Sequence, residues 1–249
     1  MNKDEIKISV ITVTYNSEAT LADTMRSVAE QTYLPYEYII VDGKSSDGTL
    51  SVAESFRGDL EAKGVRLDII SEPDKGIYDA MNKGIDRASG DIIGIINSDD
   101  RYEKDALEVV ASEYAREEFD LFYADLRMVK PDGTSFIKHA RDRKYATSRD
   151  WNHPTTFITK RIYDRYHYKT ETIHDDYDLI LRLKRHKVKT RVVNRTLAEF
   201  SMNGVSHSRS VAAAIKSIKT KYAIYRNNGY GPGYFFECLI VELGKLIIG

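Results

Sequence analysis

The chain of 249 residues lacks several features that mark whole classes of protein. It contains a single cysteine, Cys238, which excludes an intramolecular disulfide framework and is compatible with a reducing compartment. It has no run of about 18 apolar residues, so we expect no transmembrane helix. Its polar start at 1–5 leads straight into a β-branched stretch, so we expect no signal peptide and a cytoplasmic location.

The chain also lacks an excess of either charge. Lys and Arg number 37 and Asp and Glu number 38, which gives a formal net charge of -1. Bulk charge therefore does not attract nucleic acid, and we expect no nucleic-acid partner. With 42% hydrophobic and 30% charged residues, the chain is long enough for a large core and favours one α/β domain.

Strand and helix patterns alternate in the first hundred residues. Strands are expected at short β-branched runs, at 7–15, 38–42, 66–71 and 92–96. Helices are expected where apolar residues recur three and four apart, at 20–31, 49–56 and 77–88. The connections are too short for anything but parallel pairing, so this part predicts a doubly wound, mainly parallel sheet flanked by helices.

The second half is less regular. Helices are expected at 104–115, 176–185 and 210–226, and strands at 121–129, 135–138, 155–159 and 188–193. The two strands at 121–129 and 135–138 flank a Pro-Asp-Gly turn, which is typical of a hairpin. No internal repeat, low-complexity tract or linker occurs, so we expect one domain over 1–249.

The fourth predicted strand ends in the polar sequence Asn97-Ser98-Asp99-Asp100. Ligands of open α/β sheets bind outside the carboxyl ends of the strands, and aspartates there can hold a hard divalent cation. In the alternative interpretation, Asn97, Ser98 and Asp99 form only a turn before the next helix. The first strand is followed by 15–19, which has no glycine, and no complete G-x-x-x-x-G-K-[ST] loop occurs. Both absences disfavour glycine-rich phosphate loops, and a metal at Asp99 is another way to balance phosphate charge.

Four motifs, in order, resemble those of family 2 glycosyltransferases with the GT-A fold: 10–16, 41–49, 72–84 and 90–100. The resemblance is dense up to residue 110 and looser over 153–207. It implies an inverting transfer of a sugar from a nucleoside diphosphate sugar to a hydroxyl of a glycan or lipid-linked glycan in surface polysaccharide synthesis. It also implies a divalent cation, Mn²⁺ or Mg²⁺. The chain would then comprise a nucleotide-binding half at 1–105, an acceptor-side half at 106–210 and a helical tail at 211–249.

On the donor side, the resemblance implies contacts with the base and ribose for Thr14, Tyr15, Asn16 and Asp42. The Asp42 carboxylate can accept the imide N–H of uracil or thymine, which favours a UDP- or dTDP-sugar. It can instead cap the turn at 43–48. Lys75 corresponds to a loop near the nucleotide, where it would offset phosphate charge, or it is simply an exposed lysine.

The metal motif of the family is Asp-x-Asp, and here it reads Asn97-Ser98-Asp99. Asparagine offers an oxygen but no charge, so metal binding would depend mainly on Asp99, with Asn97 and Ser98 on the donor. His207 resembles a loop position that covers the diphosphate and sometimes binds the metal. The alternative for His207 is a loop histidine without that task.

The catalytic base of the family lies in a segment that reads His174-Asp175-Asp176 here. The following Leu-x-x-Arg-Leu pattern selects Asp176, with Asp175 as the second candidate. An inverting transfer needs one carboxylate on the acceptor side, although Asp176 could instead only cap the helix. Trp151 and His153 correspond to a segment near the donor sugar and acceptor. Trp151 would stack on a pyranose or pack in the core.

The run at 184–191 is strongly basic, and the next predicted helix carries further cations before an apolar tail at 234–248. These segments could seat the protein peripherally on the inner face of an anionic membrane, or they could form a solvated helix end and a packed or homodimerising helix. Two other functions also remain open. One is a sugar-phosphate nucleotidyltransferase, although its glycine- and arginine-rich loop is missing. The other is a non-catalytic protein that binds nucleotide sugars.

Overall fold

The computed structural model describes residues 3–202 and 211–248. The strands are β1 (Ile8–Thr14), β2 (Glu37–Asp42), β3 (Arg66–Ser71), β4 (Ile92–Ile95), β5 (Arg101–Tyr102), β6 (Leu121–Val129), β7 (Ser135–Lys138), β8 (Phe157–Thr159) and β9 (Thr190–Ser201). The helices are α1 (Leu21–Ala29), α2 (Thr49–Ser55), α3 (Arg57–Ala62), α4 (Ile77–Arg87), α5 (Ala106–Arg116), α6 (Lys160–Tyr163), α7 (Asp175–Arg185), α8 (Val211–Asn227) and α9 (Tyr234–Ile248). Two short 3₁₀ helices cover Lys3–Glu5 and His153–Thr155.

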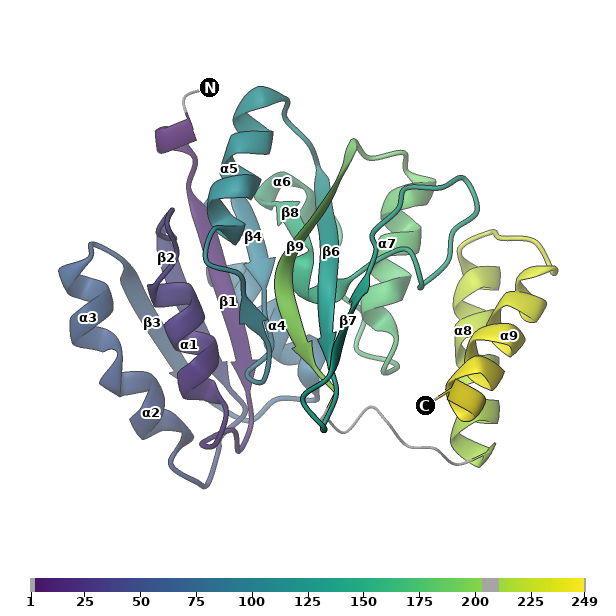
Figure 1. Cartoon of the computed structure of the whole chain (residues 1–249), viewed down its shortest axis with the longest axis horizontal. Coiled ribbons are helices and arrows are strands. Elements are labelled where there is room, and N and C mark those ends of the chain that lie inside the picture. Colours follow the sequence, from purple (N-terminus) through teal and green to yellow (C-terminus); the bar gives the residue numbers. More distant parts are fainter. Residues whose placement is uncertain (1–2, 203–210, 249) are drawn as a thin grey trace.

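These strands form one curled sheet with helices on both faces (Figure 1). Its order is β3-β2-β1-β4-β8-β6-β9-β5, and β7 pairs with the outer part of β6. The expected α/β fold, a sheet flanked by helices with a regular front half and a less regular back half, is confirmed.

The front of the sheet is parallel throughout, as the short connections predicted. β1 lies between β2 and β4, and β3 extends the sheet beyond β2. In this register Thr14 is opposite Asp42, and Asp42 is opposite Ser71. The four strands therefore end at one edge of the sheet, which we call the carboxyl edge.

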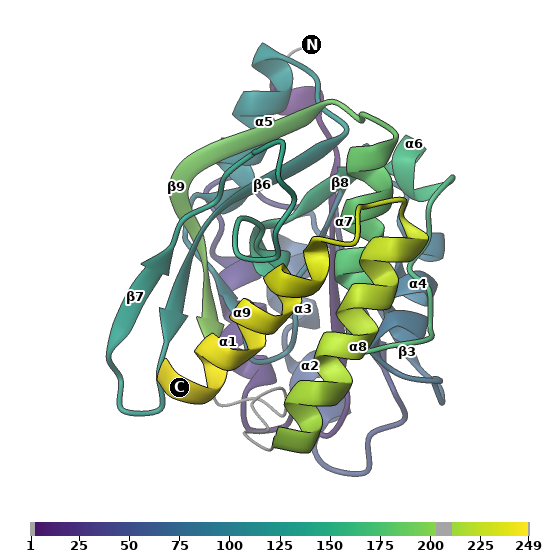
Figure 2. The ribbon, with the colours of Figure 1, turned by 90° about the vertical axis from the view of Figure 1, so that its right-hand side faces the viewer.

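The back of the sheet is mixed. β8 runs antiparallel to both β4 and β6, whereas β9 runs parallel to β6 over nearly its full length. β9 continues to Ser201, well past the expected end at 193, because its pairing with β6 shifts register around Asp125 and lets the strand curl (Figure 2). The helix expected at 49–56 is also followed at once by α3, which the pattern did not indicate.

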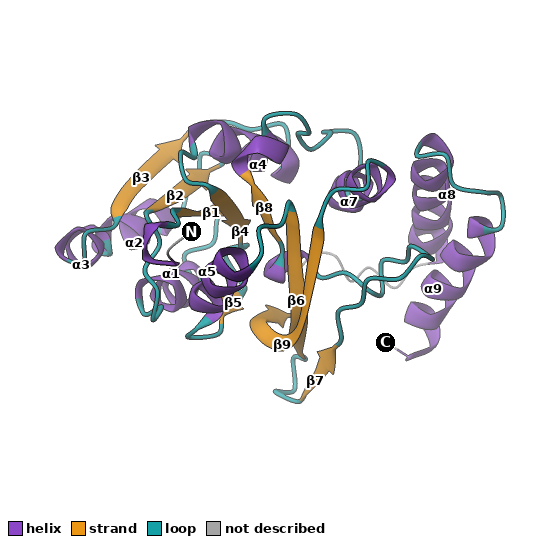
Figure 3. Cartoon of the chain, turned by 90° about the horizontal axis from the view of Figure 1, so that it is seen from above, coloured by secondary structure: helices purple, strands orange, loops and turns teal. Residues whose placement is uncertain are grey.

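Two apolar clusters fill the space on the two faces of the sheet. Alternate residues of β1 point to opposite faces, so Ile8 and Val10 join one cluster while Ile11 and Val13 join the other. The first cluster includes α1, α2, α3 and α5, and the second includes α4, α6 and α7 (Figure 3). Gly84 of α4 lies so close to β1 that a Cβ atom there would come within 2.6 Å of Ile11 Cγ2. This close approach fixes α4, whose first turn reaches the carboxyl edge.

The C-terminal helices α8 and α9 lie side by side in opposite directions and form one end of the molecule, beyond α7 (Figures 1 and 2). Ile224 and Tyr225 of α8 and Cys238 of α9 belong to the second cluster, and burial raises the pKa of the Cys238 thiol to about 11. Among the residues described, no helix is both long and apolar enough to cross a membrane.

Candidate active site

The tip of β4 and the start of α7 reach the same edge of the sheet. Because β8 is antiparallel to β4, with Phe157 opposite Gly94, the segment before β8 lies beside the residues that follow β4. His153 is in that segment, and it is close enough to Asp176 for the charge of Asp176 to act on its pKa. Figure 1 shows α7 starting at the edge toward which β1 points. Asp99 and Asp176 therefore lie at the same edge of the sheet, the carboxyl edge.

The tip of β4 presents oxygen atoms without hydrogen-bond partners. Among the residues described, neither Asn97 Oδ1 nor Asp100 Oδ2 has a partner, although both atoms are buried. Burial raises the pKa of the half-buried Asp99. Burial, and then the charge of Asp99, raises the pKa of Asp100 well above its usual range, against the Ser201 N–H that donates to it at 3.2 Å. Each raised pKa indicates a carboxylate that has no positive charge beside it to compensate for its burial.

A divalent cation fits this set of oxygen atoms only in part. Asp99 and the amide oxygen of Asn97 are suitable hard ligands, but no group of three His, Cys, Asp or Glu side chains is placed to hold a metal within 3–202 and 211–248. Diphosphate oxygens and water would complete the coordination. Ser98 is nearly buried, and its hydroxyl donates to Ser17 at 2.8 Å, which fixes the tip to the loop after β1. His207 lies outside the described residues.

The loop after β1 is fixed to the loop after β2. Asn16 adopts a left-handed conformation with φ of 48°, which asparagine tolerates better than most residues. Its side-chain oxygen accepts the Ser46 N–H at 2.9 Å, and its own N–H donates to Ser45 Oγ at 2.8 Å. Tyr15 beside it is 65% exposed, and Thr14 Oγ1 is buried without a partner in the described structure. Tyr15 is therefore exposed to a ligand, the Thr14 hydroxyl is buried without a described partner, and the Asn16 side chain holds the loop.

The Asp42 carboxylate is engaged inside the protein. The side chain is fully buried and accepts hydrogen bonds from the Ser45 N–H at 3.0 Å, from the Ser45 hydroxyl, and from Ser71 Oγ at 2.6 Å. This is the turn-capping arrangement weighed above. In this structure the Asp42 carboxylate is not exposed to an imide N–H.

Lys75 lies at the same edge, in the exposed loop that leads into α4. Its backbone N–H donates to Asp79 at 2.9 Å, so the loop is held to the first turn of the helix. The next residue, Gly76, has φ of 119°, which a residue with a side chain rarely adopts. The backbone therefore fixes where the Lys75 side chain starts, and the side chain itself extends into solvent.

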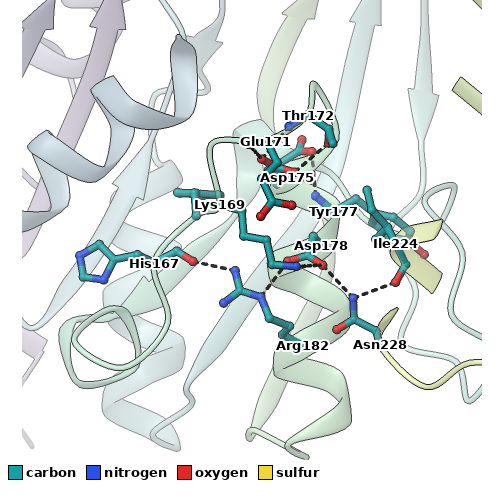
Figure 4. Close-up of polar contacts among 12 residues, drawn as sticks. His167, Lys169, Glu171, Thr172, Asp175, Tyr177, Asp178, Arg182, Ile224 and Asn228 are labelled. Carbon is teal, nitrogen blue, oxygen red and sulfur yellow. Dashed lines mark hydrogen bonds and ion pairs between the residues drawn. The ribbon is translucent and has the colours of Figure 1, made fainter. Parts of the chain in front are cut away.

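The first turn of α7 carries three carboxylates with different surroundings (Figure 4). Asp175 accepts the N–H groups of Glu171 and Thr172 at 2.6 and 3.0 Å and the Thr172 hydroxyl at 2.7 Å. Asp178 is fully buried and accepts bonds from Arg182 and Asn228, both at 2.8 Å. Both carboxylates are occupied by contacts within the protein.

Asp176 differs because it is half-buried and its carboxylate accepts the N–H of Tyr177 at 2.7 Å. It is not the N-cap of α7, since that position belongs to His174. Burial, and then the charge of Asp176, raises the pKa of Tyr78, whose hydroxyl donates to Ile173 O at 3.0 Å. Asp176 is therefore the carboxylate of this turn that remains open to a substrate hydroxyl.

Two aromatic side chains, His153 and Trp151, lie near the start of α7. Burial lowers the pKa of His153, against the charge of Asp176, so the ring is neutral near pH 7. Both ring nitrogens of His153 are buried without partners among the described residues. Trp151 is 7% exposed, donates to Thr156 Oγ1 at 2.8 Å and packs against Tyr177. The geometry favours the packing interpretation of Trp151, and it leaves both His153 nitrogens buried without a described partner.

The sequence did not single out Tyr78 or the Asp178 network. The spacing of Asp178 and Arg182, four apart on a helix, was a visible signal for an ion pair, which forms at 2.8 Å. Asn228 lies 50 residues away in the chain, and Tyr78 is 95 residues from its acceptor at Ile173. No local pattern could have linked those partners.

Comparisons with known proteins agree with this arrangement. The sequence model described as glycosyl transferase family 2 matches residues 9–174, which ends just before Asp175. A "PGL/p-HBAD biosynthesis glycosyltransferase" from Mycobacterium bovis is 41% identical over 122 residues, which cover 48% of this chain and 46% of the relative. The chain thus spans about half the length of this curated relative.

Solved structures share the fold at low sequence identity. TarS from S. aureus, in complex with UDP-GlcNAc, has a TM-score of 0.67 and 19% identity over 96% of this chain and 72% of that chain. The mannosyltransferase PcManGT from Pyrobaculum calidifontis, in complex with GDP-Man and Mn²⁺, has a TM-score of 0.68 and 16% identity over 96% and 70%. From the family match over most of its length, this chain belongs to glycosyltransferase family 2.

Proposed function

We propose that the chain is an inverting glycosyltransferase that passes a sugar from a UDP- or dTDP-sugar to a hydroxyl of a glycan or lipid-linked glycan in surface polysaccharide synthesis. The observation that carries the proposal is Asp176, a half-buried carboxylate open to a ligand at the same edge as the acidic tip of β4. A single displacement requires a base on the acceptor side of the sugar, and Asp176 can serve as that base, while the acidic tip of β4 would hold a cation beside the departing diphosphate.

In the proposed reaction, Asp176 accepts the proton of the acceptor hydroxyl while that oxygen forms a bond to C1 of the donor sugar. The attack comes from the face opposite the diphosphate, the C1–O bond to the diphosphate breaks, and its electron pair leaves with the diphosphate. His153 would donate to or accept from a sugar hydroxyl, since its neutral ring has no described partner. Trp151 would keep Tyr177, and with it the start of α7, in place.

The donor side would be formed by the loops after β1, β2 and β4. Tyr15 is exposed beside Thr14 and offers a face for the base, while Asn16 and Asp42 hold the loops. Lys75 would offset phosphate charge. The complexes of TarS with UDP-GlcNAc and of PcManGT with GDP-Man support a nucleotide-sugar donor. A divalent cation held by Asp99 and the Asn97 oxygen would supply positive charge beside the departing diphosphate.

The proposal is tested by thermal shift with UDP-, dTDP- and GDP-sugars, each with and without Mn²⁺, followed by assays of sugar release. We expect one donor to raise the melting temperature most in the presence of Mn²⁺, because a ligand that binds only the folded chain stabilises it. That donor should then be turned over, and NMR should show the inverted anomer in the product. Binding without turnover would identify a non-catalytic binding protein. Pyrophosphate release from a sugar phosphate and a nucleoside triphosphate would identify a nucleotidyltransferase.

A further inference from the structure

Helix α9 presents its apolar side to solvent and its charged side to the protein. Phe236, Ile240 and Leu243 follow one another at helical spacing and are 64%, 58% and 45% exposed. On the other side of the helix, Glu237 and Glu242 are 5% and 6% exposed. An ordinary surface helix has the reverse arrangement, so this apolar face is suited to a surface that covers it.

The buried charges fix the orientation of α9. Glu237 pairs with Arg149 at 3.0 Å and also accepts the hydroxyl of Thr147. Glu242 pairs with Lys221 of α8 at 2.6 Å, where both side chains are almost fully buried. Rotating α9 to hide its apolar side would break both ion pairs and remove the acid that faces the buried Lys221. The outward apolar face is therefore a stable feature of the fold.

A basic stripe on α8, formed by the exposed Lys216, Lys219 and Arg226, borders that face. Ile215, Lys219, Tyr222 and Arg226 follow one another at spacings of four, three and four, so they share one side of α8. Tyr222 meets Phe235 of α9 edge-on, with ring centroids 5.5 Å apart. The stripe thus adjoins the apolar face of α9. α8 contains no acidic residue, and within the described structure the exposed Lys216 and Lys219 make no ion pair.

Three of the five Lys and Arg side chains in the other basic segment of the chain are paired with acids. In the run at 184–191, Lys184 pairs with Asp142 at 2.8 Å, Lys189 with Glu117 at 3.1 Å and Arg191 with Glu113 at 2.6 Å. This run also lies where α7 ends and β9 begins, at the edge opposite the active site (Figure 1). The membrane contact considered above for this run is therefore better assigned to α8 and α9.

We propose that the outer face of the α8–α9 hairpin docks on the surface of an anionic lipid bilayer. The apolar side chains of α9 would enter the interfacial region, and Lys216, Lys219 and Arg226 would lie against acidic lipid headgroups. Charge complementarity selects this partner. A second copy of the chain, packed about a two-fold axis, would bring the same basic stripe close to itself.

Docking would also position the active site, because the hairpin is joined to the start of α7. Ser217 of α8 lies 3.0 Å from His174 Nε2, and the hydroxyl groups of Tyr225 and Tyr177 are 2.9 Å apart. Asp176 would then be held in a fixed position relative to the bilayer surface. If the proposed function holds, the acceptor is a lipid-linked glycan whose hydroxyl is presented there.

The test is co-sedimentation of the whole chain, without nucleotide sugar, with vesicles of phosphatidylcholine alone or mixed with phosphatidylglycerol. We expect binding only to the mixed vesicles, weakened by added salt. The double variant Lys216→Glu, Lys219→Glu and the double variant Phe236→Glu, Ile240→Glu should each lose at least about tenfold in binding. Lys187→Glu reverses one charge in the α7–β9 connection, half the charge change of the lysine double variant, and should bind as the wild type does.

Unfolding curves show whether each variant is folded. Donor turnover measured in solution, without vesicles, tests the proposed function separately from lipid binding. Equal binding to both kinds of vesicle, or unchanged binding of the double variants, would overturn the proposal. So would a dimer in light scattering that Phe236→Glu dissociates, since a second copy would then cover the face.

Discussion

His174 Nε2 lies 3.0 Å from the Ser217 hydroxyl, which joins the N-cap of α7 to the C-terminal helix pair. On the other side of the same turn, the Tyr78 hydroxyl of α4 donates to Ile173 O at 3.0 Å. The start of α7 is thus held from two directions by elements far away in the sequence. A general base must be fixed in position to act, and these contacts would provide that for Asp176, the base proposed above.

Replacing Asp175 with Ala should destabilise the folded chain. The change removes three accepted hydrogen bonds in a nearly fully buried position, and we expect a loss of about 2–3 kcal/mol in the free energy of unfolding. Chemical denaturation measures this loss. Asp175→Asn should lose less, because one side-chain oxygen remains. A variant with unchanged stability and abolished turnover would instead make Asp175 the base.

Replacing Asp100 with Asn should stabilise the chain near neutral pH. The folded state raises the pKa of Asp100, so its ionised form costs stability above the folded-state pKa, and this cost disappears below the unfolded value of about 3.9. Asparagine can keep the oxygen that accepts the Ser201 N–H. Melting temperatures across pH should therefore show a gain at pH 7 that fades on acidification. A gain of equal size at every pH would contradict the ionisation argument.

Replacing Asn97 with Asp should lower the stability of the metal-free chain and raise its affinity for a divalent cation. A third carboxylate next to Asp99 and Asp100 adds repulsion, so the metal-free chain should melt at a lower temperature. Mn²⁺ should bind more tightly in calorimetry and restore the melting temperature. Asn227→Asp adds the same charge on the exposed side of α8 and should leave Mn²⁺ binding unchanged. Equal Mn²⁺ affinity for Asn97→Asp and the wild type would place the metal elsewhere.

The sequence predicts the front of the sheet well because local periodicity determines it. β-branched runs and short connections fix β1 to β4 and their parallel order. β9 extends beyond its predicted end because its last residues are stabilised by pairing with β6, a partner that no local pattern names.

The same distinction holds at the site. The acidic tip of β4 and the aspartates of α7 are visible as motifs, whereas the partners that occupy Asp42 and Asp175 depend on how loops fold back. The outward apolar face of α9 likewise follows from Arg149 and Lys221, which lie outside that helix. Periodicity locates an amphipathic helix but does not say which side is buried.

The central claim is that Asp176 takes the proton of the acceptor, and the most direct measurement compares turnover and donor binding in Asp176→Asn. Asp164→Asn, which removes an exposed carboxylate paired with Lys160, is the matched control. We predict that Asp176→Asn binds the donor and melts as the wild type does while turnover falls by about 10²–10⁴-fold, and that Asp164→Asn keeps full turnover. Wild-type turnover in Asp176→Asn would contradict the claim.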